Sequence, residues 1–369
     1  MRKYYLDNIR IGIVLLVVLY HVIYIFNSVG VISNIAVKGI PQMDAFLYFV
    51  YPWFMACLFL VAGISARYSL QKRTSKQFAK ERVTKLLIPS IAGALILGWV
   101  SGYITSLYTD MFAGNADKIP GFIKYLIYSL CGIGPLWFAQ ELFLASMILL
   151  LIRKVDKKDK LWNLCGKVNM IMVLLLFLAV WGSSYLVNTP MITVYRNGIY
   201  IFMFLLGYYV FSHDNVQDMV EKWRFPLLIA AVVCGVAYTV YYYGRNYTTD
   251  ACLQSAFTNL YLWIMILAIL GCAKAWFNKS SRFTKYLSSR SFGIYVLHYP
   301  ILILFAYLVL TYLKLPMILN YLVLLIIEII VVPCLYELIS RIPVLRFLLF
   351  GISKDKEDVR SECIRSKEA

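Results

Sequence analysis

Two ionisable residues, Arg10 and His21, stand eleven positions apart in an apolar run near the N-terminus. Eleven steps of ~100° exceed three helical turns by only ~20°, with a rise of ~16 Å, so a helix places both side chains on one face. An imidazole titrates near neutral pH and can act as a general base, whereas an arginine binds phosphates. We expect Arg10 at one end of this helix, paired with Asp7, and His21 past its middle.

A structural role is the alternative for this pair, with Arg10 reaching lipid headgroups and His21 hydrogen-bonding between helices. Glu141, in a later apolar run, is expected at about the same depth as His21. A carboxylate there can orient the imidazole and stabilise its protonated form, which is what a general base needs. The alternative is that Glu141 bonds some other polar group, and both interpretations stay open.

Other histidines and one glutamate also call for a role. His298 stands two residues before Pro300, which frees the carbonyl of Val296, so a structural role and a catalytic one are both open. Glu328 falls near the middle of an apolar run, where it could pair with His298 or a tyrosine. His213 lies at the end of a helix and is expected to be solvated.

A second basic pair, Arg82 and Lys85, follows a polar segment and precedes an apolar run. At a spacing of i and i+3 they share one face of a helix, which suits the binding of phosphate groups. The alternative is an anchor that contacts lipid phosphates.

The elements that position these residues are transmembrane helices. The 369-residue chain is 61% hydrophobic and only 15% charged, with a mean hydropathy of +0.72. Apolar runs of roughly 18 residues can cross a ~30 Å hydrocarbon core, and their continuity excludes a β-barrel. The expected fold is an all-α, polytopic transmembrane bundle. About ten helices are predicted, near 9–29, 46–66, 86–107, 136–152, 169–187, 198–212, 226–243, 257–276, 291–312 and 318–341.

Basic residues concentrate in every second loop, namely 67–85, 153–167 and 274–290. By the positive-inside rule these loops are cytoplasmic, so both termini are expected in the cytoplasm. The net charge of +17 therefore reflects topology and contact with the lipid bilayer. A nucleic-acid partner is not expected.

A single membrane domain is predicted for residues 1–351, followed by a charged, disordered cytoplasmic tail at 352–369. The stretch 122–130 is apolar but too short to span, which favours an interfacial or re-entrant helix. The first apolar run follows Arg2 and Lys3 directly and is expected to be retained as a helix. The cysteines are scattered without CxxC spacing, and no metal site is predicted.

Several segments together resemble the integral-membrane acyltransferases of family 3, which include O-antigen, exopolysaccharide and glucan acyltransferases. The leading match is Tyr5-Leu6-Asp7-Asn8-Ile9-Arg10 with Leu19-Tyr20-His21. Further blocks follow in order, namely Phe59 to Ile64, Arg82 to Pro89, Trp137-Phe138 with Glu141, Phe204 to Tyr208, and Gly293 to Pro300. Lys85 stands where many members have a second arginine, and Ala62 where many have serine. The match is closest to the glucan-modifying branch.

The resemblance implies an O-acyltransferase of the cell membrane that moves an acetyl or succinyl group from cytoplasmic acyl-CoA to a hydroxyl of a cell-surface or lipid-linked carbohydrate. His21 would be the base or a transient acyl carrier, and Arg10, Arg82 and Lys85 would hold the phosphates of CoA. The acyl-CoA is a co-substrate, and no bound cofactor is implied. Some members carry an additional extracytoplasmic domain, so a partner extracytoplasmic transferase is a further expectation.

Two other functions remain to be weighed. A proton-coupled transporter or exporter would use His21, Glu141 and Glu328 as a proton relay. A non-catalytic membrane scaffold is the third possibility.

Overall fold

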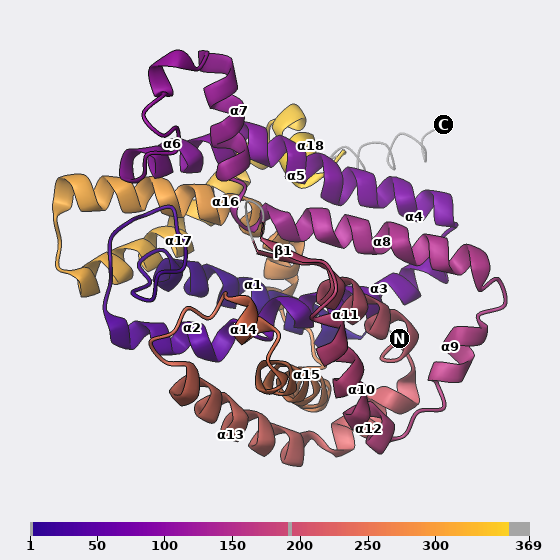
Figure 1. Ribbon diagram of the computed structural model, residues 1–369. Helices are drawn as coiled ribbons and strands as arrows, with labels where there is room; N and C mark the ends of the chain where they lie inside the picture. Colours follow the sequence, from indigo (N-terminus) through magenta and orange to yellow (C-terminus); the bar gives the residue numbers. More distant parts are fainter. Residues whose placement is uncertain (1–2, 191–193, 354–369) are drawn as a thin grey trace, which may run out of the picture.

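The computed structural model describes residues 3–190 and 194–353, most of which are helical (Figure 1). The first half contains α1 (Tyr4–Tyr24), α2 (Asp44–Val50), α3 (Phe54–Leu70), α4 (Ser75–Arg82), α5 (Ile88–Gly93), α6 (Trp99–Tyr108), α7 (Gly121–Cys131), α8 (Trp137–Val155) and α9 (Lys160–Cys165). The second half contains α10 (Met170–Ser183), α11 (Asn197–Tyr209), α12 (Asp214–Lys222), α13 (Arg224–Tyr242), α14 (Asp250–Leu253), α15 (Ala256–Trp276), α16 (Arg282–Leu308), α17 (Met317–Ser340) and α18 (Pro343–Phe350). A short antiparallel hairpin, β1 (Asn188–Pro190) with β2 (Val194–Arg196), joins α10 to α11.

Eight helical stretches of the described chain are long and apolar enough to cross a membrane. They are Tyr4–Tyr24, Pro41–Leu70, Ser75–Tyr108, Gly134–Val155, Arg224–Tyr242, Ala256–Trp276, Arg282–Leu313 and Met317–Ser340. The shorter apolar helices α10 and α11 occupy the fifth and sixth predicted positions. The prediction of an all-α, polytopic bundle is confirmed, and the count of about ten agrees with it.

Three parts of the long helices are π-helical, at Val83–Leu87, Ala94–Gly98 and Val309–Leu313. A π-helical turn closes hydrogen bonds between residues five apart, so it changes the facing of the side chains that follow. The first of these segments begins directly after Arg82 and contains Lys85. The basic pair therefore does not lie on a regular α-helix.

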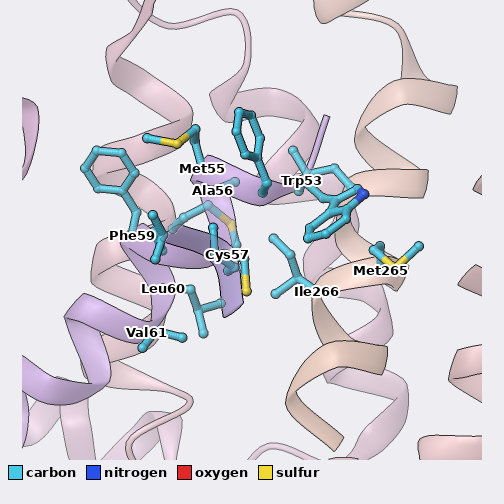
Figure 2. Close-up of a cluster of buried hydrophobic side chains, with 14 of the residues drawn as sticks. Trp53, Met55, Ala56, Cys57, Phe59, Leu60, Val61, Met265 and Ile266 are labelled. Carbon is cyan, nitrogen blue, oxygen red and sulfur yellow. The ribbon is translucent and has the colours of Figure 1, made fainter. Parts of the chain in front are cut away.

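The interior is packed around α3 and α15. Figure 2 shows Trp53 and Cys57 facing Met265 and Ile266, and both Cys57 and Ile266 are fully buried. Apolar burial does not drive association between helices inside a lipid bilayer, so close van der Waals packing must hold this contact.

Two glycines allow α3 and α11 to approach each other closely. A Cβ atom on Gly63 would lie 1.9 Å from the Phe204 carbonyl oxygen, and one on Gly207 would lie 2.0 Å from the Leu60 carbonyl oxygen. Small residues at a crossing permit such contact between backbones in membrane proteins. The second and fifth matched sequence blocks thus form one reciprocal helix crossing.

The basic loops gather at one end of the bundle, which we call the basic end. There Lys3 pairs with Asp214, and Lys274 pairs with Asp218. The side-chain amide of Asn8 donates to the carbonyl oxygens of Phe277 and Lys279 at 2.5 and 2.8 Å. These contacts join α1, α12 and the loop before α16. The grouping of alternate loops at one end agrees with the loop charges.

A buried arginine fastens the α8–α9 loop to the basic end. Arg67 pairs with Asp159 at 3.1 Å, lies 4.1 Å from the centroid of the Trp162 ring and donates to the Tyr208 hydroxyl at 3.1 Å. The ring of His213 stacks on the ring of Trp162, with the two centroids 3.9 Å apart. His213 is only 9% exposed, so the expectation of a solvated side chain is wrong.

The short helix expected near 122–130 is present as α7. It packs against α6, and a Cβ atom on Gly102 would lie 2.0 Å from the Tyr128 carbonyl oxygen. Figure 1 shows this α6–α7 hairpin beside α16. The predicted tail lies, from residue 354 onward, outside the described residues.

Candidate active site

His21 lies in the last turn of α1, far from the basic end. Its ring is surrounded by other rings: the centroids of Tyr20, Tyr24 and Tyr299 lie 5.3, 5.8 and 5.0 Å away, each edge-on. The side chain is half-buried. His21 is therefore held in an aromatic setting and still accessible.

The hydrogen bonds of His21 fix which ring nitrogen carries the proton. Nδ1 lies 2.8 Å from the Val17 carbonyl oxygen, one helical turn earlier. A carbonyl oxygen only accepts, so Nδ1 must be the protonated nitrogen, and Nε2 carries the lone pair in the neutral ring. Nε2 is the atom that can take a proton from a substrate.

A second histidine, His298 of α16, meets this ring. Its Nε2 lies 3.4 Å from Nδ1 of His21, and its own Nδ1 donates to the Tyr295 carbonyl oxygen at 2.7 Å. By the same reasoning Nε2 of His298 carries a lone pair, so it is a second and longer acceptor for the single Nδ1–H of His21, which the Val17 carbonyl oxygen accepts at 2.8 Å. His298 is fully buried. The carbonyl it uses is that of Tyr295, not the Val296 carbonyl that Pro300 frees.

His298 thus occupies the place that sequence reasoning gave to Glu141. No hydrogen bond joins Glu141 to His21, both of which are described residues, and Oε1 of Glu141 is buried without any partner. Equal depth did not imply contact, and Glu141 instead lies within electrostatic range of Tyr200 of α11. Sequence reasoning had left His298 open between a structural and a catalytic role, and no sequence signal indicated its contact with His21.

Glu328 of α17 is 3% exposed, and neither of its carboxylate oxygens has a hydrogen-bond partner. The suggested pairing with His298 or a tyrosine is therefore wrong. Among His21, Glu141 and Glu328, all within the described chain, no two are hydrogen-bonded.

Arg10 stands at the basic end of α1, as expected. It donates to Asp7 at 2.8 Å, which confirms the predicted pair, and to the Ser288 hydroxyl of α16 at 3.2 Å. Beside it is a cavity of about 60 Å³ lined by Tyr4, Asp7, Asn8, Ser280, Thr284, Lys285 and Ser288. A side chain that is 40% exposed next to such a cavity remains open to a ligand.

Arg82 and Lys85 make separate contacts. The Arg82 guanidinium lies 4.5 Å from the centroid of the Phe78 ring, and its Nε is buried without a partner. Lys85 pairs with Glu81 at 2.6 Å and is exposed. Because π-helical spacing replaces α-helical spacing after Arg82, the simple shared face drawn from an i, i+3 rule does not hold.

The bundle of long apolar helices, with ionisable side chains buried inside it, defines the chain as a multi-pass membrane protein. The family model described as an acyltransferase domain matches residues 3–337. The chain therefore belongs to the integral-membrane acyltransferases of family 3, and it is a multi-pass membrane enzyme.

Curated relatives extend over almost the whole chain. Glucans biosynthesis protein C of Escherichia coli strain K12 is 24% identical over 377 residues, covering 95% of this chain and 94% of the relative. The proteins of the same name from strains HS and SE11 give the same identity and coverage. No solved structure matches the chain.

Proposed function

We propose that this acyltransferase moves an acetyl or succinyl group from cytoplasmic acyl-CoA to a hydroxyl of a cell-surface or lipid-linked carbohydrate, with His21 as general base. The relatives named for glucan biosynthesis favour a glucan acceptor. The proposal places the enzyme in the cell membrane with its basic end toward the cytoplasm, in line with the positive-inside rule.

The observation that carries the proposal is the fixed tautomer of His21. Its Nδ1–H is held by Val17 and His298, so Nε2 presents a lone pair on a half-buried ring. When Nε2 takes a proton, the positive charge of the ring is stabilised by these two acceptors. His298 then acts as a positioning residue for the base.

The transfer step balances without any further reagent. Nε2 of His21 removes the proton of the acceptor hydroxyl while its oxygen attacks the thioester carbonyl carbon. The carbon–sulfur bond breaks, and the leaving thiolate of CoA takes the proton from Nε2. The products are the acyl ester and free CoA, and His21 returns to its starting tautomer.

The donor is held, in this proposal, from the other end of α1. Arg10 lies beside the cavity at the basic end and can bind phosphate groups of CoA. Eleven residues of α-helix separate it from His21, a rise of about 16 Å. An extended pantetheine arm can bridge such a span, which brings the thioester to His21.

The test uses the purified full chain with labelled acetyl-CoA or succinyl-CoA and a glucose oligosaccharide as acceptor. We expect wild type to form a labelled ester, and His21→Ala to lose transfer by about a hundredfold or more. Arg245→Gln, a substitution of an exposed arginine at the same end of the bundle as His21, is the matched control. Equal transfer by His21→Ala and wild type would show that His21 is not the base.

A further inference from the structure

A second polar cluster lies at the same end of the bundle as His21, and it consists of Glu141, Arg196 and Tyr200. Arg196 ends β2, Tyr200 lies in the first turn of α11, and Glu141 lies near the start of α8. The three side chains are 4, 2 and 5% exposed, respectively. Charged groups are seldom buried this deeply without a functional or structural reason.

The two charges of this cluster do not pair with each other. Oε1 of Glu141 is buried and has no partner, and within the described chain no carboxylate lies within 4.0 Å of the Arg196 guanidinium. Arg196 donates to the Leu253 carbonyl oxygen at 3.2 Å and to Tyr200. A buried carboxylate without a donor is costly, so a ligand that supplies one would stabilise the site.

Aromatic faces flank the charges. The Tyr200 ring stacks on Phe59 at 4.8 Å and on Trp137 at 5.2 Å, with interplanar angles of 15° and 29°. Rings of this kind cover the C–H faces of a ligand, while a carboxylate accepts from hydroxyl groups and a guanidinium donates to them. This combination suits a polyhydroxylated ring, such as a sugar residue.

Tyr51 connects the cluster to His21. It stacks on Tyr20 at 6.2 Å, and Tyr20 packs against the His21 ring at 5.3 Å. Tyr51 is half-buried and lies within electrostatic range of Arg196 and Tyr200. Ring contacts therefore link His21 to Tyr51, and Tyr51 interacts electrostatically with the buried charges.

We propose that Glu141, Arg196, Tyr200 and Tyr51 form the acceptor subsite, which binds a sugar ring and presents one of its hydroxyls to Nε2 of His21. This inference rests on the proposed function. It assigns Glu141 to recognition of the acceptor through hydrogen bonds with sugar hydroxyls.

The experiment measures the KM for a glucose oligosaccharide and, separately, the KM for acyl-CoA. Glu141→Gln and Arg196→Gln are expected to raise the acceptor KM by about tenfold, since each loses a hydrogen bond to a charged group. The donor KM should stay within about twofold because these residues are far from Arg10. Arg196→Lys, which retains the charge, should recover part of the acceptor affinity, and Tyr200→Phe keeps the stacked ring for a milder test of the hydroxyl.

Two matched variants control for disturbance of the fold. Glu328→Gln changes another buried glutamate without partners, and Arg245→Gln changes an exposed arginine that contacts the Tyr241 ring at the same end of the bundle. Neither should alter the acceptor KM. The inference is overturned if the Glu141 and Arg196 variants keep the wild-type acceptor KM, or if the controls raise it equally. Failure of the proposed function is distinct, because wild type would then transfer no acyl group at all.

Discussion

Nε2 of His298 lies 3.4 Å from Nδ1 of His21, and 277 residues separate the two along the chain. Both rings use their Nδ1–H groups on backbone carbonyls of their own helices. The contact between α1 and α16 therefore combines two tautomers that are each fixed locally. The neutral imidazole of His298 contacts Nδ1 of His21, the position at which a carboxylate orients the histidine of a Ser-His-Asp triad.

Removal of the second ring tests its positioning role. His298→Ala is expected to lower kcat by about ten- to a hundredfold while both KM values change little, because His21, the proposed base, loses an acceptor that aligns it. His298→Gln can still accept from His21 through its amide oxygen and should recover part of kcat. Equal kcat in His298→Ala and wild type would contradict the role, as would a failure of Gln to improve on Ala.

Arg82, the last residue of α4, and Lys85, which follows it, are predicted to differ in their effect on the donor. Lys85 is exposed and already paired with Glu81, whereas the Arg82 guanidinium has a buried Nε without a partner. Arg82→Ala should raise the KM for acyl-CoA by about tenfold, and Lys85→Ala by about twofold or less, as for an exposed pair. The acceptor KM serves as the internal control. Equal donor KM values in the two variants would show that Arg82 has no special part in donor binding.

The reciprocal glycines of α3 and α11 give a prediction on stability. Gly207→Ala places a methyl group 2.0 Å from the Leu60 carbonyl oxygen, so the helices must separate, at a cost of about 1–3 kcal/mol. Gly12→Ala is the matched control, since its Cβ meets nothing within 4 Å and alanine favours a helix. Thermal unfolding in detergent should show a lower Tm for Gly207→Ala alone. A Tm equal to that of Gly12→Ala would mean that the crossing tolerates a wider separation.

His213 lies outside the membrane-spanning helices, and its titration makes the stability of the fold depend on pH. Burial lowers the pKa of His213 below its usual value near 6.5, opposed by the bond to the Trp162 carbonyl and aided by the nearby Arg67 charge. The unfolded chain then takes up a proton that the folded chain does not, so stability is present above about pH 6.5 and falls as the pH drops below it.

His213→Phe keeps a ring against Trp162 and removes the titration. We expect the Tm of wild type to fall between pH 7 and pH 5 more steeply than that of the variant. His21 and His298 titrate in both proteins, so their contribution cancels in the comparison. Parallel Tm curves for the two proteins would contradict this assignment.

Hydropathy was sufficient to locate the helices, since each predicted run corresponds to a helix and even α7 lies where a short apolar stretch was expected. The pair of Arg10 with Asp7 also followed from helical spacing. Partners across helices did not follow, because depth restricts a residue to a layer but leaves its direction open. Glu141 was expected at the depth of His21, whereas no contact with His21 was expected for His298, and only the packing of α16 against α1 brings the two histidines together.

Two further differences have local causes. The π-helical turn at Val83–Leu87 cannot be inferred from apolar periodicity, and it separates the contacts of Arg82 from those of Lys85. His213 was expected in water because it lies at a helix end between polar residues. The α8–α9 loop folds back over it through Trp162 and Arg67, a tertiary contact that composition does not indicate.

The attachment of α1 at the basic end has a consequence for donor selection. Lys3 and Asn8 fasten the start of the helix to α12 and to the loop before α16, and a continuous α-helix does not stretch between Arg10 and His21. Under the proposed function, the gap between phosphate binding and acyl transfer is a fixed length. Thioesters on shorter arms can occupy only one end at a time, so the helix acts as a molecular ruler for the carrier of the acyl group.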